Sequence, residues 1–414
     1  MVYVINKQGQ ALMPTERFGK VRRLLKNSLA HVVCRIPFTI QLDYDTTDYT
    51  QPVSLGVDAG SKHIGISVTT SEKELYAADV ELRNDIVDKL STRRELRRTR
   101  RSRLRYRKAR FNNRVSSKRK GWLAPSVENK IQTHLTVVEK IHKFLPITNI
   151  VVETAAFDIQ KIKNPSISGS GYQQGEQLDF FNVREYVLFR DNHICQHCKG
   201  KSKDKVLNVH HIESRKTGGD SPNNLITLCE TCHKAYHRGE FKLNVKRGRS
   251  FRDAAFMGIM RWSFYDRLKN IYPNVSMTFG YITKNTRITN NLPKEHYVDA
   301  RCISGNPTAK PLGYYFYQKK VRCQNRQIHK ANFLKGGRKK LNQAPFLVKG
   351  FRLFDLVEYK KELYYIFGRR SNGSFDIRRL DGTKVNKGSI NCKYLRLIDK
   401  RRSILTEKRM QVNL

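Results

Sequence analysis

Alternating apolar and polar positions over residues 53–82 predict three consecutive strands. "VSLGVDAGSKHIGISVTT" gives an apolar strand, a turn that contains glycine and a second alternating strand, and "ELYAADVEL" continues the pattern. This spacing is typical of an antiparallel β-meander. Asp58 stands alone at the end of the first apolar run.

Other segments predict a mixed α/β chain with several parts. Residues 1–50 read as a small α/β module, with Thr15 as the N-cap of a helix. Residues 126–145 predict a helix and residues 149–157 a buried strand that carries Glu153. Further expected elements are a polar linker at 159–180, a helix at 250–273, a strand at 275–283, a helix carrying His296 and Asp299, and a small β barrel or sandwich in the last hundred residues.

Composition narrows the class of partner. The 414 residues contain 80 Lys and Arg against 36 Asp and Glu, a formal net charge of +44. Self-repulsion of this size favours a polyanionic partner, so nucleic acid is the expected one. A membrane surface is the alternative, but no apolar run reaches the length of about 18 residues that a spanning helix needs. The N-terminus "MVYVINKQGQ" does not resemble a signal peptide.

The most basic segment, residues 91–110, contains eleven Arg or Lys among its twenty residues. Arginine favours helix, yet cations four residues apart repel one another, so we expect phosphates to order this helix. Because the arginine fork matches phosphate oxygens, a nucleic-acid contact is preferred over a solvated charge run. The candidate contacts are Arg93, Arg94, Arg97, Arg98, Arg100, Arg101, Arg103, Arg105, Arg107 and Arg110.

Four of the eight cysteines form two Cys-x2-Cys pairs, which are Cys195 with Cys198 and Cys229 with Cys232. Two such pairs thirty residues apart predict a tetrahedral Zn²⁺ site rather than a disulfide framework. Four thiolates fill the coordination of zinc. The ion is therefore expected to be structural and leaves the nearby histidines free for other chemistry.

The stretch "VHHIESR" at 209–215 places His210 and His211 side by side. Adjacent side chains on a strand point to opposite faces, so the two histidines cannot do the same work. His233 and His237 are four residues apart and share one helix face. A ββ hairpin followed by that helix would bring one histidine of the pair onto this face, where a cation could bind. The other would point into a cleft, where an asparagine could hold its orientation.

The order Cys-x2-Cys, His-His, Asn, Cys-x2-Cys-His-x3-His resembles the HNH nucleases and their ββα-metal fold. The resemblance implies that His211 is the general base and that His210 and His233 hold a catalytic Mg²⁺. It also implies that Asn224 orients the base, although Asn223 competes for this role. His237 is either a further ligand or a packing histidine, and His197 is a bystander or a neighbour of the metal site.

Three segments, "LGVDAGSKHIGIS", "IVVETAAF" and "HYVDAR", together resemble the split parts of a RuvC-type nuclease on an RNase H-like sheet. By that resemblance Asp58, Glu153 and Asp299 bind two Mg²⁺. His296 precedes Asp299 by three residues and would help to activate water or bind metal. The alternative for each acid is an ordinary turn or surface carboxylate.

The whole order resembles the IscB family, transposon-encoded RNA-guided nucleases regarded as ancestors of the CRISPR type II effectors. "ALMP" stands where the family reads Pro-Leu-Met-Pro, with Ala11 as a departure. The implied fold is multidomain α/β: an RNase H-like sheet split in three, an inserted HNH domain, an arginine-rich bridge helix and a small β-rich C-terminal domain. The expected parts are 1–50 (N-terminal), 51–85, 116–160 and 243–308 (RuvC-like), 86–115 (bridge helix), 161–183 (linker), 184–242 (HNH) and 309–414 (contacts to RNA and to the motif flanking the target).

The resemblance implies a monomeric protein in a ribonucleoprotein with a structured guide RNA (ωRNA), in the cytoplasm of a bacterium or archaeon. HNH would cut the guide-paired strand of double-stranded DNA and RuvC the displaced strand. Two alternatives remain, a guide-independent DNA endonuclease and a non-catalytic nucleic-acid-binding protein.

Overall fold

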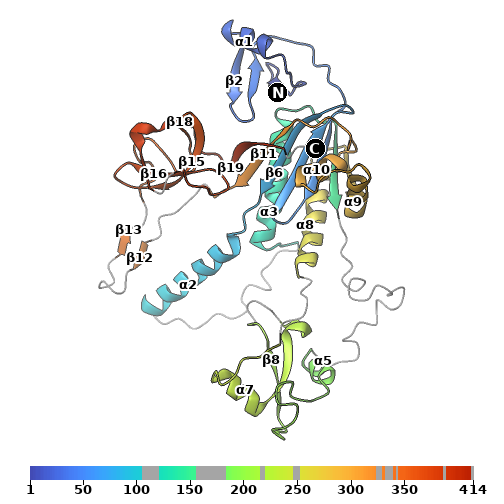
Figure 1. Cartoon of the computed structure of the whole chain (residues 1–414), viewed down its shortest axis with the longest axis vertical. Helices are drawn as coiled ribbons and strands as arrows, with labels where there is room; N and C mark the ends of the chain where they lie inside the picture. The colour runs from blue at the N-terminus through green and yellow to red at the C-terminus, as the bar shows by residue number, and fades with distance from the viewer. Residues whose placement is uncertain are drawn as a thin grey trace. The chain divides into compact units, whose positions relative to one another are not determined.

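A computed structural model describes residues 1–104, 121–154, 183–214, 220–245, 252–322, 329–331, 339–341, 344–385 and 388–411 (Figure 1). The chain divides into two compact units. One comprises Met1–Ala155 and Ile259–Leu414, and the other is Ala156–Gly258. Each unit is described by itself.

A seven-stranded mixed sheet forms the centre of the first unit. Its order is β10-β7-β4-β5-β6-β11-β19, in which β4, β5 and β6 are antiparallel neighbours and confirm the predicted meander. β10 and β7 lie parallel to β4, β11 lies parallel to β6, and β19 closes the other edge antiparallel to β11. The bounds are β4 Ser54–Ala59, β5 His63–Thr69, β6 Glu74–Glu81, β7 Asn149–Thr154, β10 Val275–Phe279, β11 Tyr314–Lys320 and β19 Ile404–Met410.

Helix α10 (His296–Ile303) packs directly on β4 and β5. Two glycines make this close approach possible. A Cβ atom at Gly56 would lie 1.9 Å from the carbonyl oxygen of Ala300, and one at Gly65 would lie 1.9 Å from that of His296. The sheet therefore carries the predicted helix of His296 and Asp299 at a fixed place over β4, the strand that contains Asp58.

The other helices of this unit that matter for the site are α3 (Pro125–His142), α8 (Arg252–Lys269) and α9 (Gly280–Thr289). Helix α8 begins in the second unit and ends in the first. Arg267 of α8 forms a bidentate ion pair with Glu128 of α3, with N–O distances of 2.7 and 2.8 Å. The predicted strand 275–283 ends at Phe279, because the backbone turns into α9 at Gly280.

The N-terminal residues form the expected small α/β module. Strands β1 (Tyr3–Ile5), β2 (Ala30–Cys34) and β3 (Thr39–Leu42) are ordered β1-β3-β2, and α1 spans Phe18–Lys26. The prediction that Thr15 caps this helix is wrong, since the N-cap is Arg17. Thr15 is instead held in a β-bridge with Val2, so the helix begins three residues later.

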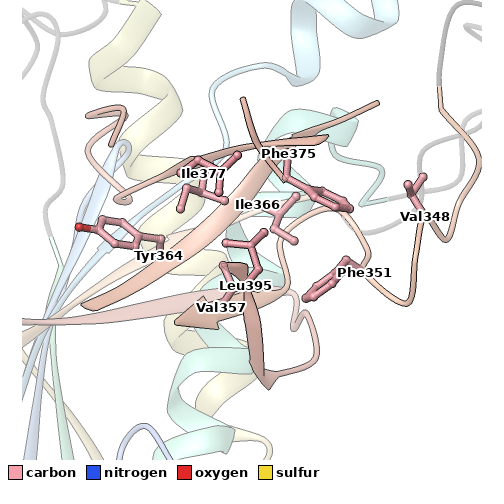
Figure 2. Close-up of a cluster of buried hydrophobic side chains, with 9 residues drawn as sticks. Val348, Phe351, Val357, Tyr364, Ile366, Phe375, Ile377 and Leu395 are labelled. Atoms are coloured by element: carbon pink, nitrogen blue, oxygen red, sulfur yellow. The ribbon is translucent and has the colours of Figure 1, made fainter. Parts of the chain in front are cut away.

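Most of the C-terminal residues form a separate five-stranded antiparallel sheet, ordered β17-β16-β15-β14-β18. One buried cluster, which includes Val357, Ile366, Phe375 and Ile377, packs on this sheet (Figure 2). The bounds are β14 Leu356–Tyr359, β15 Glu362–Arg369, β16 Ser374–Arg378, β17 Ile390–Asn391 and β18 Arg396–Asp399, beside the short pair β12 His329–Ala331 and β13 Lys339–Leu341. β11 and β19 also come from the C-terminal residues but belong to the large sheet.

The second unit contains α5 (Val183–Arg190), the antiparallel hairpin of β8 (Leu207–His211) and β9 (Leu225–Cys229), the 3-10 turn η2 (Pro222–Asn224) and α7 (Glu230–His237). The predicted order of hairpin followed by helix is therefore present. Asp191 joins the end of α5 to the hairpin, because its carboxylate accepts a hydrogen bond from the Thr227 backbone at 2.9 Å.

Candidate functional site

The four cysteines of the two Cys-x2-Cys pairs converge in the second unit. Their sulfur atoms all lie within 4.8 Å of one another, and Cys195, Cys229 and Cys232 are buried. Zinc–sulfur bonds of about 2.3 Å imply sulfur–sulfur edges of about 3.8 Å in a tetrahedron. The Cys198 and Cys229 sulfurs are 3.8 Å apart. The cluster thus suggests zinc binding, as the sequence predicted.

A second cluster unites His210 of β8 with His233 and His237 of α7. One ring nitrogen from each lies within 4.8 Å of the others, and the Nε2 atoms of His233 and His237 are 3.3 Å apart. His210 is 8% exposed, and its Nε2 atom has no hydrogen-bond partner among the described residues. Three imidazoles around an unsatisfied buried nitrogen fit a divalent cation. The structure therefore brings together the predicted ligands and adds His237 to them.

Burial keeps the inner histidine neutral. Burial and, to a smaller extent, the charges of His233 and His237 together lower the pKa of His210 to about 4. Burial and the neighbouring His237 also lower the pKa of His233. A neutral imidazole has the free lone pair that a metal ligand needs, so these two rings are ready to coordinate near pH 7.

His211 faces away from this cluster, as strand alternation predicts. Its Nε2 atom lies 2.9 Å from an oxygen of Asp220. A carboxylate on Nε2 fixes the ring and leaves Nδ1 as the nitrogen that can accept a proton. The sequence reasoning missed Asp220, whose only signal was an acid directly before the "SPNN" turn.

Asn224 holds the chain just beyond His211 through the backbone of Glu213. It is fully buried, its side-chain oxygen accepts from the Glu213 backbone nitrogen at 2.9 Å, and its amide donates to the Glu213 carbonyl at 3.0 Å. Asn223 instead accepts a hydrogen bond from Ser221 at 2.6 Å. Of the two asparagines, Asn224 has the geometry that restrains the segment after His211. His197 stacks on Phe241, outside both clusters.

The acids of the first unit meet at the ends of β4 and β7 and at α10. Asp58 is 8% exposed and Glu153 is 9% exposed. His296 Nδ1 lies 2.9 Å from an Asp58 oxygen, and its ring stacks on His63, with centroids 5.2 Å apart. His63 in turn contacts Asp79 at 2.9 Å. The helical partner predicted from sequence therefore reaches the predicted strand acid.

Two arginines lie among these acids and were not predicted. Arg261 of α8 places a guanidinium nitrogen 3.0 Å from Glu153 and 3.9 Å from Asp58, while its Nε donates to the Ala59 carbonyl at 2.9 Å. Arg287 of α9 lies 2.9 Å from Asp299 as an ion pair, although the angle does not make a hydrogen bond. The acidic group is thus held together by internal cations. Among the described residues, its carboxylates do not form a set with ligand atoms within 4.8 Å of one another.

The pKa directions follow from this environment. Burial raises the pKa of the Glu153 carboxyl, and the Asp58 charge raises it further, while Arg261 lowers it. Burial and then Asp58 raise the pKa of Asp299. The hydrogen bond to Asp58 raises the pKa of His296. The Asp58 charge thus raises the pKa of both Glu153 and Asp299, which is a condition under which a cation binds favourably among these acids.

The arginine-rich segment is helical over the residues described. Helix α2 spans Ile86–Leu104 (Figure 1). Arg93, Arg94 and Arg97 are exposed on it. Arg98, Arg100, Arg101 and Arg103 lie in the helix, but only their backbone is described. Arg105, Arg107 and Arg110 lie outside the described residues. The exposed cations leave a nucleic-acid contact as the prediction for this helix.

Comparison with known proteins identifies two segments. The chain matches the RRXRR protein family over residues 2–175 and the HNH endonuclease family over residues 195–239. Residues 97–101 read Arg-Arg-Thr-Arg-Arg within the first match. The second match contains both the cysteine cluster and the histidine cluster. The resemblance to IscB drawn from the motifs is confirmed at these two segments.

Other similarities are local or weak. A 41-residue stretch is 42% identical to "Anaredoxin" of Nostoc sp. (strain PCC 7120 / SAG 25.82 / UTEX 2576), covering 10% of this chain and 54% of that protein. Structures of Streptococcus thermophilus Cas9 in complex with the AGAA PAM and the GGAA PAM match at 15% and 16% identity, each with a TM-score of 0.33, 51% coverage of this chain and 30% of theirs. The chain thus spans less than a third of those proteins and about half of that curated relative.

The described helices also bear on the membrane alternative. None of them is both long and apolar enough to cross a membrane.

Proposed function

We propose that this chain, which joins an RRXRR segment to an HNH endonuclease module, is an RNA-guided DNA endonuclease with two metal-dependent cutting sites. The observation that carries the proposal is the HNH module, in which a three-histidine cluster stands beside a separately oriented histidine. The net charge of +44 supports a nucleic-acid partner that neutralises the protein.

At the HNH module, His210, His233 and His237 would hold one divalent cation, for which three imidazoles favour a transition metal over the predicted Mg²⁺, and the bound ion would supply charge stabilisation to the scissile phosphate. His211 takes a proton from the attacking water at Nδ1, because Asp220 occupies its Nε2 atom. Asn224 keeps the loop after His211 in place. The cysteine cluster holds structural Zn²⁺ and fixes the start of α7. We assign the guide-paired DNA strand to this site.

At the acidic site, Asp58, Glu153 and Asp299 would hold two Mg²⁺, which supply a nucleophile and stabilise the leaving oxygen when bound. Carboxylate oxygens are the ligands that Mg²⁺ prefers. His296 is oriented by Asp58 and can accept or return a proton beside these acids. We assign the displaced strand to this site.

The guide RNA is the third part of the proposal. We expect it to contact the arginines of α2 and much of the remaining basic surface, since arginine pairs with phosphate oxygens through two hydrogen bonds. Base pairing would then read the DNA sequence, while the protein reads only a short flanking motif. The C-terminal residues 309–414 are assigned to RNA and to that motif.

Strand-specific cutting by the purified ribonucleoprotein tests the proposal. The copurifying RNA is sequenced, and DNA that matches it is labelled on each strand in turn. His211→Ala should abolish cutting of the guide-paired strand only, and Asp58→Asn should abolish cutting of the displaced strand only. His31→Ala changes an exposed histidine of the N-terminal module and should cut both strands as the wild type does.

The outcome also separates the alternatives. Sequence-specific cutting by RNA-free protein would establish the guide-independent endonuclease. Tight binding of matched DNA with no cutting of either strand under Mg²⁺ or Mn²⁺ would establish the non-catalytic binding protein. Loss of both cuts in either single variant would show that the two sites do not act on separate strands.

A further inference from the structure

Two aromatic side chains are exposed at the junction of β10 and α9. The rings of Phe279 and Tyr281 are stacked, with an interplanar angle of 9° and centroids 6.2 Å apart. Phe279 is 37% exposed and Tyr281 is 66% exposed. Phe279 ends β10, the terminal strand of the seven-stranded sheet, and Tyr281 lies in the first turn of α9. Neither ring therefore contributes much to the core.

The residue between these aromatics touches the acidic site. Gly280 lies so close to Glu153 that a Cβ atom there would be 3.2 Å from the carboxylate oxygen. In the parallel register of β10 and β7, Thr278 pairs with Glu153 and Phe279 with Thr154. By strand alternation Phe279 points to the face of β10 opposite to that of Thr278 and Glu153, so the stacked rings lie at the sheet edge, next in sequence to the glycine that approaches a carboxylate assigned to metal binding.

The surroundings are basic. Lys284 follows Tyr281 by three residues on α9 and is exposed, so the two side chains share one face of the helix. Aromatic rings beside a lysine match single-stranded nucleic acid, whose unpaired bases stack on aromatic faces and whose phosphates pair with cations. A duplex offers no free base faces to such a pair.

We propose that Phe279 and Tyr281 form a stacking platform for unpaired bases of the DNA strand cut at the acidic site, and that Lys284 contacts its phosphate backbone. The inference rests on the proposed function of that site and adds a substrate subsite to it. The platform positions single-stranded DNA against Glu153 without reading its sequence, since every base has a face that can stack.

Fluorescence tests the platform without any cutting. In Tyr281→Trp, a twelve-nucleotide oligo(dT) added to the full ribonucleoprotein in EDTA should quench the new tryptophan. The wild type, with Trp122 and Trp262, gives the background. An abasic oligonucleotide of the same length should cause little quenching, because it has phosphates but no bases. Equal quenching by both oligonucleotides would overturn the stacking proposal.

Strand-specific kinetics tests its role in the reaction. Loss of one stacked base weakens binding roughly 5- to 150-fold. Tyr281→Leu should therefore raise KM for displaced-strand cutting by about tenfold or more, and Tyr281→Phe should restore it. The guide-paired strand should be cut as before. Tyr49→Leu, at a tyrosine that is 90% exposed in another part of the chain, is the matched control.

The two proposals fail differently. If oligo(dT) quenches the tryptophan introduced by Tyr281→Trp and no strand is cut by the wild type, the platform stands and the nuclease assignment fails. If both strands are cut and Tyr281→Leu leaves KM unchanged, the nuclease stands and the platform fails. Quenching by a copurified protein or by lipid vesicles, with none by oligo(dT), would assign this surface to a different partner and overturn the inference.

Discussion

Arg261 is the side chain whose removal most directly tests how the acidic site is balanced. Its guanidinium lies 3.0 Å from Glu153 and 3.9 Å from Asp58, and its side chain is only 10% exposed. At an effective dielectric constant of about 20, the closer contact has a gross attraction of about 5 to 6 kcal/mol. Desolvation of the ions offsets part of this attraction, so the net loss on removal must be smaller.

The loss of stability in Arg261→Met cannot exceed the free energy of protonating Glu153, the acid that loses its partner. In Arg261→Met, Glu153 is left without its partner and takes up a proton instead of staying charged. From an ordinary pKa of 4.5, protonation at pH 7 costs about 3.4 kcal/mol. We therefore expect Arg261→Met to lower the free energy of unfolding by about 3 kcal/mol in EDTA. A divalent cation should recover much of this loss, because it replaces the missing positive charge.

Thermal unfolding of the full ribonucleoprotein in EDTA and in Mg²⁺ measures the loss of stability and its recovery by a divalent cation. Paramagnetic resonance of added Mn²⁺ measures the affinity of the acidic site for metal without any cutting. Arg267→Met is the control, since Arg267 lies on the same helix and pairs with the partly exposed Glu128. It should cost about 1 kcal/mol or less, with no change in Mn²⁺ affinity. If Arg261→Met melts with the wild type in EDTA, or if Mg²⁺ stabilises both equally, the guanidinium does not compensate these carboxylates.

Three further predictions follow from other features. Cys229→Ser, or removal of zinc by a chelator, should abolish guide-paired-strand cutting and spare displaced-strand cutting, as measured by zinc content and strand-labelled gels. Gly65→Ala should destabilise the protein by several kcal/mol and reduce displaced-strand cutting, since its Cβ would lie 1.9 Å from the His296 carbonyl oxygen. Gly19→Ala in helix α1 meets no atom within 4 Å, so in the same denaturation assay it should cost nothing and stabilise the protein by up to about 1 kcal/mol. Burial lowers the pKa of His134 from 6.5 to about 4, so below pH 6.5 the folded protein binds fewer protons than the unfolded chain. The free energy of unfolding should therefore fall by about 2 kcal/mol between pH 7.5 and pH 5. Urea unfolding at the two pH values should show a smaller fall in His134→Gln.

The sequence predicted those site residues whose signal is local. Asp58 and Glu153 each end an apolar run, and His233 and His237 have helical spacing. The periodicity of the sequence and the position of each residue in it were therefore enough to predict them. The meander 53–82 and the hairpin before α7 were predicted for the same reason. The strands of these elements pair with strands that are adjacent in sequence, and their apolar pattern indicates which face is buried.

Residues that act through distant partners escaped prediction. Arg261 pairs with acids that lie more than a hundred positions earlier in the chain, and its one sequence signal was a single cation inside the apolar run "FMGIMRW". β11 and β19 were expected in a C-terminal domain, yet they pair with each other and with β6 in the large sheet. No local pattern encodes such pairings, because they depend on how separated segments meet.

The environments of the two candidate metal sites shift the pKa values of their ligands in opposite directions. At the HNH module, burial and mutual repulsion lower the pKa of the inner histidine, so the ligands are neutral and little energy is spent in binding a cation. At the acidic site, burial and the Asp58 charge raise the pKa of Glu153 and Asp299, whereas Arg261 and Arg287 lower it. A metal entering there competes with guanidinium groups rather than with protons. Arg261 therefore sets the positive charge with which such a metal would compete.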